Sequence, residues 1–237
     1  MRRTLGLAGF GMVTMMAVGL TVPAAGAAGN SVAAPANSSS TQLAGYIAKA
    51  PASATSGITF TVPVLKCTAA LAAIWQGAFV ISTKGALIGT GVFLTCQKGK
   101  AAYIGVLQPG GTKTYMTTFT PAAGDSIVVS TSVSALSSKV SFTDVKQKKT
   151  ASVSGTGSAN LANLDGEVAL VSTATHAQLP VPSFGTIANS AATENGKSLA
   201  AGKATAVNMA TVAKLLQVLT GPLTGAGNAF TETFKHS

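Results

Sequence analysis

The sequence predicts an all-β protein built as an antiparallel β-sandwich. From Gly45 onward, short β-prone runs recur at intervals of roughly ten residues, with turn residues between them. Within Gly57 to Val64 the apolar residues alternate with threonines, which is typical of a strand that buries one face. Runs of this kind without intervening helices favour one sheet packed on another over a mixed α/β fold.

The expected strands can be placed in order by their apolar runs and by the turns that separate them. Pro109-Gly110-Gly111 and Gly124-Asp125 are turn signals, because glycine and proline favour the backbone angles that turns require. Near the end of the chain, apolar residues between 212 and 219 recur with helical spacing, which predicts one short C-terminal helix capped by Asn208. The expected strands span residues 57–64, 72–80, 87–94, 101–107, 112–119, 126–133, 140–145, 149–153, 167–171 and 229–234.

Residues 1–27 have the features of a signal peptide. An arginine pair supplies positive charge, an apolar run follows, and Ala25-Gly26-Ala27 offers the small side chains that a signal peptidase requires. A membrane anchor is the alternative, since the apolar run is about long enough to span a bilayer, but the small-residue exit favours cleavage. Residues 28–41 are small and polar, which predicts a flexible leader. Residues 42–237 are expected to form one sandwich domain, without a transmembrane segment in the mature form.

The charge of the chain indicates an attraction to anionic surfaces. The sequence has 16 Lys and Arg against 6 Asp and Glu, a formal net charge of +10. Both arginines lie in the predicted signal peptide, so the mature chain lacks the arginine forks that recognise phosphates and bases. The densest cluster, Lys146, Lys148 and Lys149, contains no aromatic residue for base stacking, which disfavours specific nucleic-acid binding. The two remaining interpretations are a solvated loop and a contact with anionic cell-surface polymers.

Two cysteines, Cys67 and Cys96, predict one disulfide in an exported chain. Closing a loop of about thirty residues would stabilise the fold by roughly 3–4 kcal/mol through chain entropy. The alternatives are two free thiols, which export disfavours, and a metal site, but neither His176 nor His236 has a ligand-like spacing to a cysteine. We therefore expect no metal and no other cofactor. We expect the mature protein to be secreted, either extracellular or associated with the cell envelope.

Landmarks along the mature chain form an ordered set. The set starts at Gly45-Tyr46-Ile47-Ala48, passes Trp75 and Gly77, and ends in the strand from Gly227 to Phe234. Its other members are Phe60-Thr61-Val62-Pro63, Cys67, Gly89-Thr90-Gly91, Cys96, Gly124-Asp125-Ser126-Ile127, Glu167-Val168-Ala169-Leu170-Val171 and Pro180-Val181-Pro182-Ser183-Phe184-Gly185. In this order the landmarks resemble those of the secreted glutamic endopeptidases, the eqolisins. The resemblance implies a concanavalin-like jelly roll of two large antiparallel sheets, with a cleft on one concave face.

The resemblance also implies a chemistry that needs a glutamine and a glutamate across the cleft. The glutamate acts as general acid and base on a water, and the glutamine polarises the substrate carbonyl. The family's glutamine precedes Thr-Gly, a position held here by Gly89, and its reactive glutamate ends a Glu-x-x-x-Glu strand, a position held by Val171. Two further acidic positions are held by Phe79 and Val106, so none of the four residues can carry a proton. Gln76 adjoins the tryptophan and is expected to point to the opposite face of the strand.

These apolar replacements lead to the main functional prediction, a non-catalytic eqolisin-like protein with a binding or envelope-associated role. Its predicted cleft contains Trp75, Phe79, Val106 and Glu167, and its ligand would be a peptide, a glycan or an anionic cell-surface polymer. The first alternative is an acid endopeptidase with a site rearranged around Glu167. That residue lies about 13 Å from Val171 along a strand, so it cannot replace the family glutamate in place. The second alternative is binding to anionic polymers through the lysine cluster.

Overall fold

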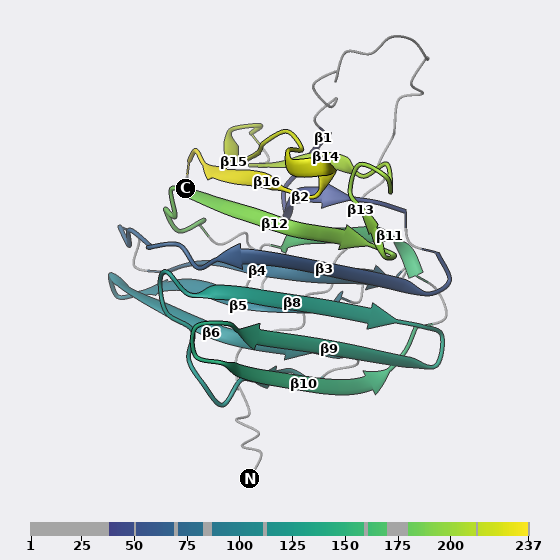
Figure 1. Ribbon diagram of the computed structural model, residues 1–237. Coiled ribbons are helices and arrows are strands. Elements are labelled where there is room, and N and C mark those ends of the chain that lie inside the picture. Colours follow the sequence, from purple (N-terminus) through teal and green to yellow (C-terminus); the bar gives the residue numbers. More distant parts are fainter. Residues whose placement is uncertain are drawn as a thin grey trace, which may run out of the picture.

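The computed structural model describes residues 38–49, 51–68, 71–82, 87–110, 113–158, 161–169, 180–211 and 213–236. The only helical element in these residues is a 3-10 turn at Gly225–Gly227, so the prediction of an all-β fold is confirmed (Figure 1). The strands are β1 Ser38–Ser40, β2 Leu43–Ile47, β3 Ala54–Thr61, β4 Leu71–Ser82, β5 Leu87–Gln97, β6 Lys100–Gln108, β7 Tyr115–Met116, β8 Ser126–Val133, β9 Ser137–Asp144, β10 Lys149–Thr156, β11 Leu161–Ala169, β12 Thr186–Glu194, β13 Lys197–Ser198, β14 Thr205–Ala210, β15 Leu216–Thr220 and β16 Phe230–Phe234.

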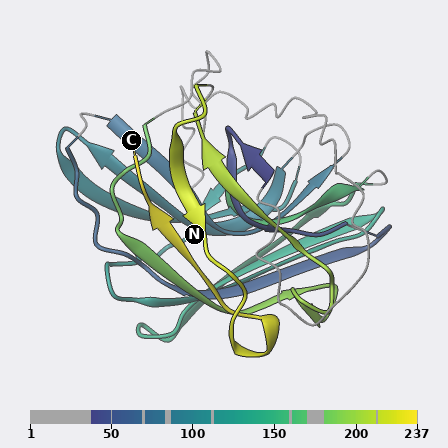
Figure 2. The same ribbon diagram turned by 90° about the horizontal axis from the view of Figure 1, so that it is seen from above.

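Two layers of mainly antiparallel strands face each other and make the predicted sandwich (Figure 1). The front sheet has the order β10-β9-β8-β3-β12-β16-β15-β14, and the back sheet has the order β11-β4-β5-β6-β7. Strand β2 joins the two sheets, because it pairs with β14 on one side and with β11 on the other. Strands β4 and β5 of the back sheet lie against β3, β8 and β9 of the front sheet. Seen from above, both layers bend and twist (Figure 2).

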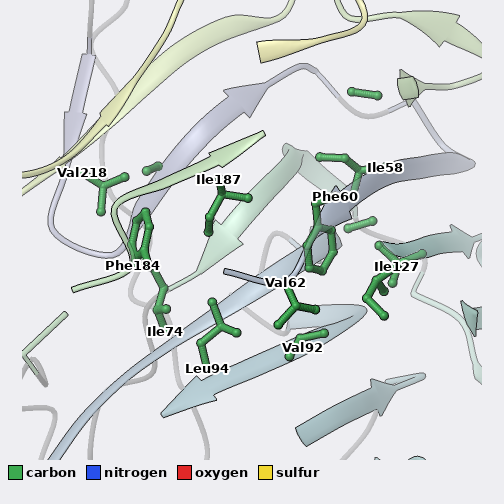
Figure 3. Close-up of a cluster of buried hydrophobic side chains, with 14 of the residues drawn as sticks. Ile58, Phe60, Val62, Ile74, Val92, Leu94, Ile127, Phe184, Ile187 and Val218 are labelled. Carbon is green, nitrogen blue, oxygen red and sulfur yellow. The ribbon is translucent and has the colours of Figure 1, made fainter. Parts of the chain in front are cut away.

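The main core fills the space between the two sheets. Strands β3, β8 and β9 alternate buried with more exposed residues, so each of them gives one face to the core. Figure 3 shows Phe60 of β3 in the same packed group as Val92 and Leu94 of β5. Burying a large apolar side chain of this kind stabilises the fold by about 1.5–3 kcal/mol. Strands β4 and β5 bury both faces, because a second apolar cluster covers the outer side of the back sheet.

The predicted disulfide is present between Cys67 and Cys96, whose Cα atoms lie 5.4 Å apart. It ties the segment that follows β3 to the end of β5, so it links the front sheet to the back sheet. In the described part of the chain, no helix is long and apolar enough to cross a membrane.

The amino-terminal predictions lie largely outside the described residues. The signal peptide over residues 1–27 and the leader up to residue 37 stay predictions. The last residues assigned to the leader differ from the expectation, because Ser38–Ser40 form β1 and pair in parallel with Val207 to Met209 of β14. A short polar segment of this kind has no apolar alternation, so its strand depends on the neighbour with which it pairs.

The prediction of a short C-terminal helix is wrong. The segment forms β14 and β15, joined by a turn in which the backbone N–H of Thr211 donates to the carbonyl of Leu215 at 2.8 Å. Lys214 has a φ of +63°, a left-handed conformation that ends any right-handed helix. Asn208 caps no helix, and its Oδ1 accepts a hydrogen bond from the backbone N–H of Thr220 at 2.9 Å. Short apolar runs fit both the face of a helix and the buried positions of two strands.

One other local prediction also needs correction. The strand expected over residues 112–119 reduces to β7, Tyr115–Met116. Gly89-Thr90-Gly91 lies in the middle of β5, as the strand expected over residues 87–94 requires. Gly91 pairs there with Gly77 of β4, and a Cβ atom at Gly91 would lie 2.0 Å from the carbonyl oxygen of Gln76. These glycines are therefore required by the close approach of the two strands, as glycine within a strand often is.

Candidate functional site

The outer face of the back sheet carries the second apolar cluster, which we call the Trp75 cluster. Alternate residues of β4 point to opposite faces, so Ala78 packs in the main core whereas Trp75 and Phe79 pack in this cluster. The structure thus brings together Trp75, Phe79 and Val106, three of the four residues predicted to line the cleft. The Trp75 cluster consists of buried Leu43, Trp75, Phe79, Ile81 and Leu87, with partly buried Ile47, Phe93 and Val106 against them.

The aromatic ring of Phe79 occupies the space in which a side chain at Gly89 would lie. The two residues are direct cross-strand partners in β4 and β5. A Cβ atom at Gly89 would lie 2.2 Å from Cδ1 of Phe79 and 2.7 Å from the carbonyl oxygen of Ala78. The ring of Phe79 is held in turn by Trp75, with 4.7 Å between the ring centroids and an edge-to-face angle of 75°. Gly89 and Phe79 are therefore complementary in size, and a larger residue at position 89 requires Phe79 to move.

Glu167 lies on β11, beside the strand that carries Trp75 and Phe79. In the pairing of β11 with β4, Gly166 is opposite Phe79 and Val168 is opposite Gln76, with a register shift between them. The backbone of Glu167 sits at this irregularity, next to the Trp75 cluster. Its side chain and the whole of Val171 lie outside what the structure describes. Irregularities of this kind often occur next to active sites, where they re-aim a side chain.

The indole N–H of Trp75 is a buried hydrogen-bond donor without a partner in the described part of the chain. Trp75 is 4% exposed, and its Nε1 has no acceptor among the described residues. Most buried polar groups have a partner, because an unpaired one costs about 1–3 kcal/mol.

A buried polar network links the two sheets behind the Trp75 cluster, and the sequence reasoning did not identify it. Nε2 of Gln76 donates to Oδ1 of Asn189 at 3.1 Å, and Nδ2 of Asn189 donates to Oε2 of Glu232 at 2.9 Å. Glu232 is fully buried, and this burial raises its pKa to about 7, although the hydrogen bonds from Asn189 and Gln76 lower it. The available signal was Gln76 itself, a polar residue inside an apolar run, which needs a partner when buried.

The lysine cluster, predicted as a solvated loop or an anion-binding surface, lies at the turn between β9 and β10. Nζ of Lys146 pairs with Oδ1 of Asp125 at 3.0 Å, and Nζ of Lys149 lies 5.9 Å from the centre of the Phe119 ring. Burial alone would raise the pKa of Asp125, but the backbone N–H of Ala122 and Lys146 hold it below its usual value. Two of the three lysines therefore have partners within the chain. The described residues contain no group of three side chains suited to hold a metal ion.

Comparison with known proteins places this geometry in a family. The profile of the Peptidase A4 family matches residues 41–227. A search of curated proteins found no match. The fold is similar to scytalido-glutamic peptidase with a transition-state analogue inhibitor, with 16% sequence identity, a TM-score of 0.68, and coverage of 82% of this chain and 98% of that chain.

Two further solved structures share the fold. SCP-B, described as a member of the eqolisin family of peptidases in a complex with the tripeptide Ala-Ile-His, has 16% identity, a TM-score of 0.62, and coverage of 82% and 98%. Aspergilloglutamic peptidase from Aspergillus niger has 17% identity, a TM-score of 0.56, and coverage of 70% and 100%. At such identities the likeness shows the fold alone.

The family match overturns the main functional prediction. A non-catalytic protein with a binding or envelope-associated role was inferred from four apolar residues at the family's polar positions. The matched profile instead describes peptidases and extends over most of the chain. The inference failed because it took apolar residues at four aligned positions to mean that the reaction is absent, although acid–base chemistry requires only suitable groups near the reacting atoms.

Proposed function

Because the chain belongs to the peptidase A4 family, the glutamic peptidases or eqolisins, we propose that it is an endopeptidase that cleaves peptide bonds at acid pH. The observation that carries the proposal is the extent of the family match, which includes β4, β5 and β11. The resemblance assigns positions of the family's chemistry to Phe79 on β4, Gly89 on β5 and Glu167 on β11, and these strands are neighbours in the back sheet. The solved relatives bind a peptide-based transition-state analogue or a tripeptide, which supports a peptide as the substrate here.

The proposed site is a rearranged form of the family site. Gly89 and Val171 take the positions of the family's glutamine and second glutamate, so the proton-transfer group has to come from another residue. We assign this role to Glu167, whose backbone lies beside Trp75 and Phe79. Asp165, the other acidic residue of β11, is paired with Val80 of β4, which packs in the main core.

In the proposed reaction, the ionised carboxylate of Glu167 takes a proton from a water as the water oxygen attacks the substrate carbonyl carbon. The carbonyl oxygen becomes an oxyanion, and the indole N–H of Trp75, which has no acceptor among the described residues, donates a hydrogen bond to it. Glu167 then gives its proton to the leaving nitrogen as the carbon–nitrogen bond breaks. The water is thereby divided between the two products. The partly buried Phe93 and Val106, which pack against the Trp75 cluster, supply an apolar surface for a substrate side chain.

Buried carboxyl groups support activity in acid. Burial raises the pKa of Glu232 to about 7 and that of Glu194 to about 8, so both are uncharged at acid pH. Acid unfolds many proteins because it protonates carboxylates that form ion pairs in the folded state. Among the described residues, Lys146 and Asp125 form the one such pair. Acidification therefore removes little of what holds this fold together.

We also propose that the protein is secreted. The disulfide between Cys67 and Cys96 supports an oxidising compartment outside the cytosol. Sequencing the amino terminus of the protein recovered from culture medium tests the proposal, with a start just after Ala27 expected. A protein that stays inside the cell and retains Met1 would contradict it.

The test of function is proteolysis of an unfolded protein substrate between about pH 2 and about pH 7. We expect cleavage in acid, and we expect Glu167→Gln to reduce kcat by at least about 100-fold, because glutamine cannot accept the proton. Trp75→Phe keeps an aromatic ring but removes the N–H, and should lower kcat by about 100- to 1000-fold.

The control is Asp125→Asn, which changes a carboxyl outside the Trp75 cluster and should leave activity unchanged. Absence of cleavage at every pH would overturn the proposed function. Full activity of the Glu167→Gln protein would overturn the assignment of that residue.

A further inference from the structure

A cavity of about 400 Å³ lies at the opposite end of β12 from its pairing with β16. Its walls come from the end of β2, from the β12–β13 hairpin and from the turn that follows β13. None of its lining residues belongs to the Trp75 cluster. A volume of this size is within the range of sites for small molecules, about 300–1000 Å³.

Glu194 lines this cavity, and its carboxyl oxygens make no hydrogen bond of normal geometry with a described residue. Glu194 is 2% exposed, and neither Oε1 nor Oε2 makes a hydrogen bond to a described residue, although the backbone N–H of Ala48 faces the carboxyl. A buried polar group without a partner is costly, so a ligand that pairs with it gains that energy. Gly202 lies directly beside this carboxyl, because a Cβ atom added there would be in van der Waals contact with Oε2 of Glu194, at 3.6 Å.

The remaining charged residues that line the cavity are all cationic. They are Lys49 after β2, Lys197 in β13 and Lys203 in the following turn, and the side chains of all three are exposed. Apart from Glu194, the described lining contains no acidic residue. The cavity therefore carries a net positive charge whether Glu194 is protonated or ionised, which favours an anion over a cation.

We propose that this cavity binds a small oxyanion group, a carboxylate or a phosphate, which accepts hydrogen bonds from the protonated carboxyl of Glu194 and from the lysine ammonium groups. Ammonium groups and a protonated carboxyl are all donors, and an oxyanion offers several acceptor oxygens. Hydrogen bonds between charged donors and an oxyanion are about twice as strong as neutral ones. The site is separate from the Trp75 cluster, so it does not depend on the proposed peptidase activity.

The proposal includes a pH dependence. Burial raises the pKa of Glu194 to about 8, and the backbone N–H of Ala48 offsets only part of this effect. Below that pH the carboxyl is neutral and can donate its proton to the ligand. Above it the carboxylate repels the ligand and offers no proton, so binding weakens.

The experiment is calorimetric titration of the mature protein with sulfate, whose charge is constant over the pH range used, at fixed ionic strength. We expect saturable binding that is at least about tenfold weaker in the triple variant Lys49→Gln, Lys197→Gln, Lys203→Gln. The matched control is Lys98→Gln, Lys100→Gln, Lys113→Gln, which removes the same charge from exposed positions outside the cavity. An equal loss of sulfate affinity in both triple variants would show general charge attraction and would overturn the proposal. The absence of saturable sulfate binding to the parent protein would also overturn it.

Two single variants test the role of Glu194. Glu194→Gln is neutral at every pH and keeps an N–H donor, so sulfate binding should become independent of pH between about 6 and about 9. Gly202→Ala places a methyl group against Oε2 and should weaken binding without changing any charge. An unchanged pH dependence in Glu194→Gln, or unchanged affinity in Gly202→Ala, would overturn the assignment. The affinities for acetate and for inorganic phosphate are then compared at one pH. Tighter binding of acetate identifies the natural ligand group as a carboxylate, and tighter binding of inorganic phosphate identifies it as a phosphate.

Discussion

The fully buried carboxyl of Glu232 makes the stability of this protein depend on pH in a way that one substitution can measure. Oε2 of Glu232 accepts a hydrogen bond from Asn189, whereas Oε1 of Glu232 and Oε1 of Gln76 have no partner among the described residues. Both unpaired atoms are acceptors. A proton on Glu232 supplies the donor that this part of the network lacks, and ionisation removes it.

The size and sign of the effect follow from the pKa. Folding raises the pKa of Glu232 from its ordinary value of 4.5 to about 7, first because of burial. At about 1.36 kcal/mol for each pKa unit, the difference corresponds to about 3 kcal/mol. Because the folded state binds the proton more tightly, this stabilisation is fully present below pH 4.5, declines as the pH rises, and is lost above about pH 7.

The substitution is Glu232→Gln, which has nearly the same shape and stays neutral. Near pH 4 we expect its free energy of unfolding to be within about 1 kcal/mol of that of the parent protein, because the amide can replace the protonated carboxyl. Near pH 8 we expect the variant to be more stable than the parent by about 3 kcal/mol. Urea unfolding at both pH values measures these differences, provided that the m-value is unchanged. A variant that loses the same stability at both pH values would refute the reasoning, because Glu232 would then act through its shape or hydrogen bonds alone.

Three other predictions concern packing, the disulfide and the surface. Gly89→Ala should destabilise the fold by about 1–3 kcal/mol, because the new methyl overlaps the Phe79 ring. The same change in a Phe79→Leu background should cost less, and equal costs in a double-mutant cycle would contradict the contact. Replacing Cys67 and Cys96 with serine should lower the free energy of unfolding by about 3–4 kcal/mol, and an unchanged urea midpoint would show that the disulfide contributes nothing. Lys146→Gln should cost at most about 1 kcal/mol, because the side chain of Lys146 is 69% exposed in its ion pair, and a larger loss of stability would show that the pair is not screened by solvent.

Local sequence pattern was sufficient for the middle of the fold. The strand predicted over residues 126–133 coincides with β8, and the runs that predicted β4, β5 and β6 each lie within the observed strand. The run predicted over residues 57–64 overlaps β3, which ends at Thr61. In such segments the alternation of side chains between two faces is a property of the strand itself, so it can be read without knowledge of the partner. The disulfide was predictable for a similar reason, because an exported chain with two cysteines has one pairing available.

The C-terminal strands depended on their partners. The apolar residues of β15 have a spacing that also fits a helix, and the left-handed backbone of Lys214 separates β14 from β15. Propensity alone is a weak guide for such short segments, because the ladder of hydrogen bonds to neighbouring strands decides their conformation. The pairing of β15 with β16 supplies that ladder.

The sequence by itself determined the all-β class, the disulfide and membership of a peptidase family, because each depends on local pattern or on an ordered set of landmarks. Only the tertiary structure showed that Phe79 fills the space beside Gly89. It also brought Gln76 into hydrogen-bond contact with Asn189, 113 residues further along the chain, and Asn189 with Glu232. Contacts between opposite sheets depend on register and packing distance, and neither quantity is encoded in the neighbourhood of a single residue.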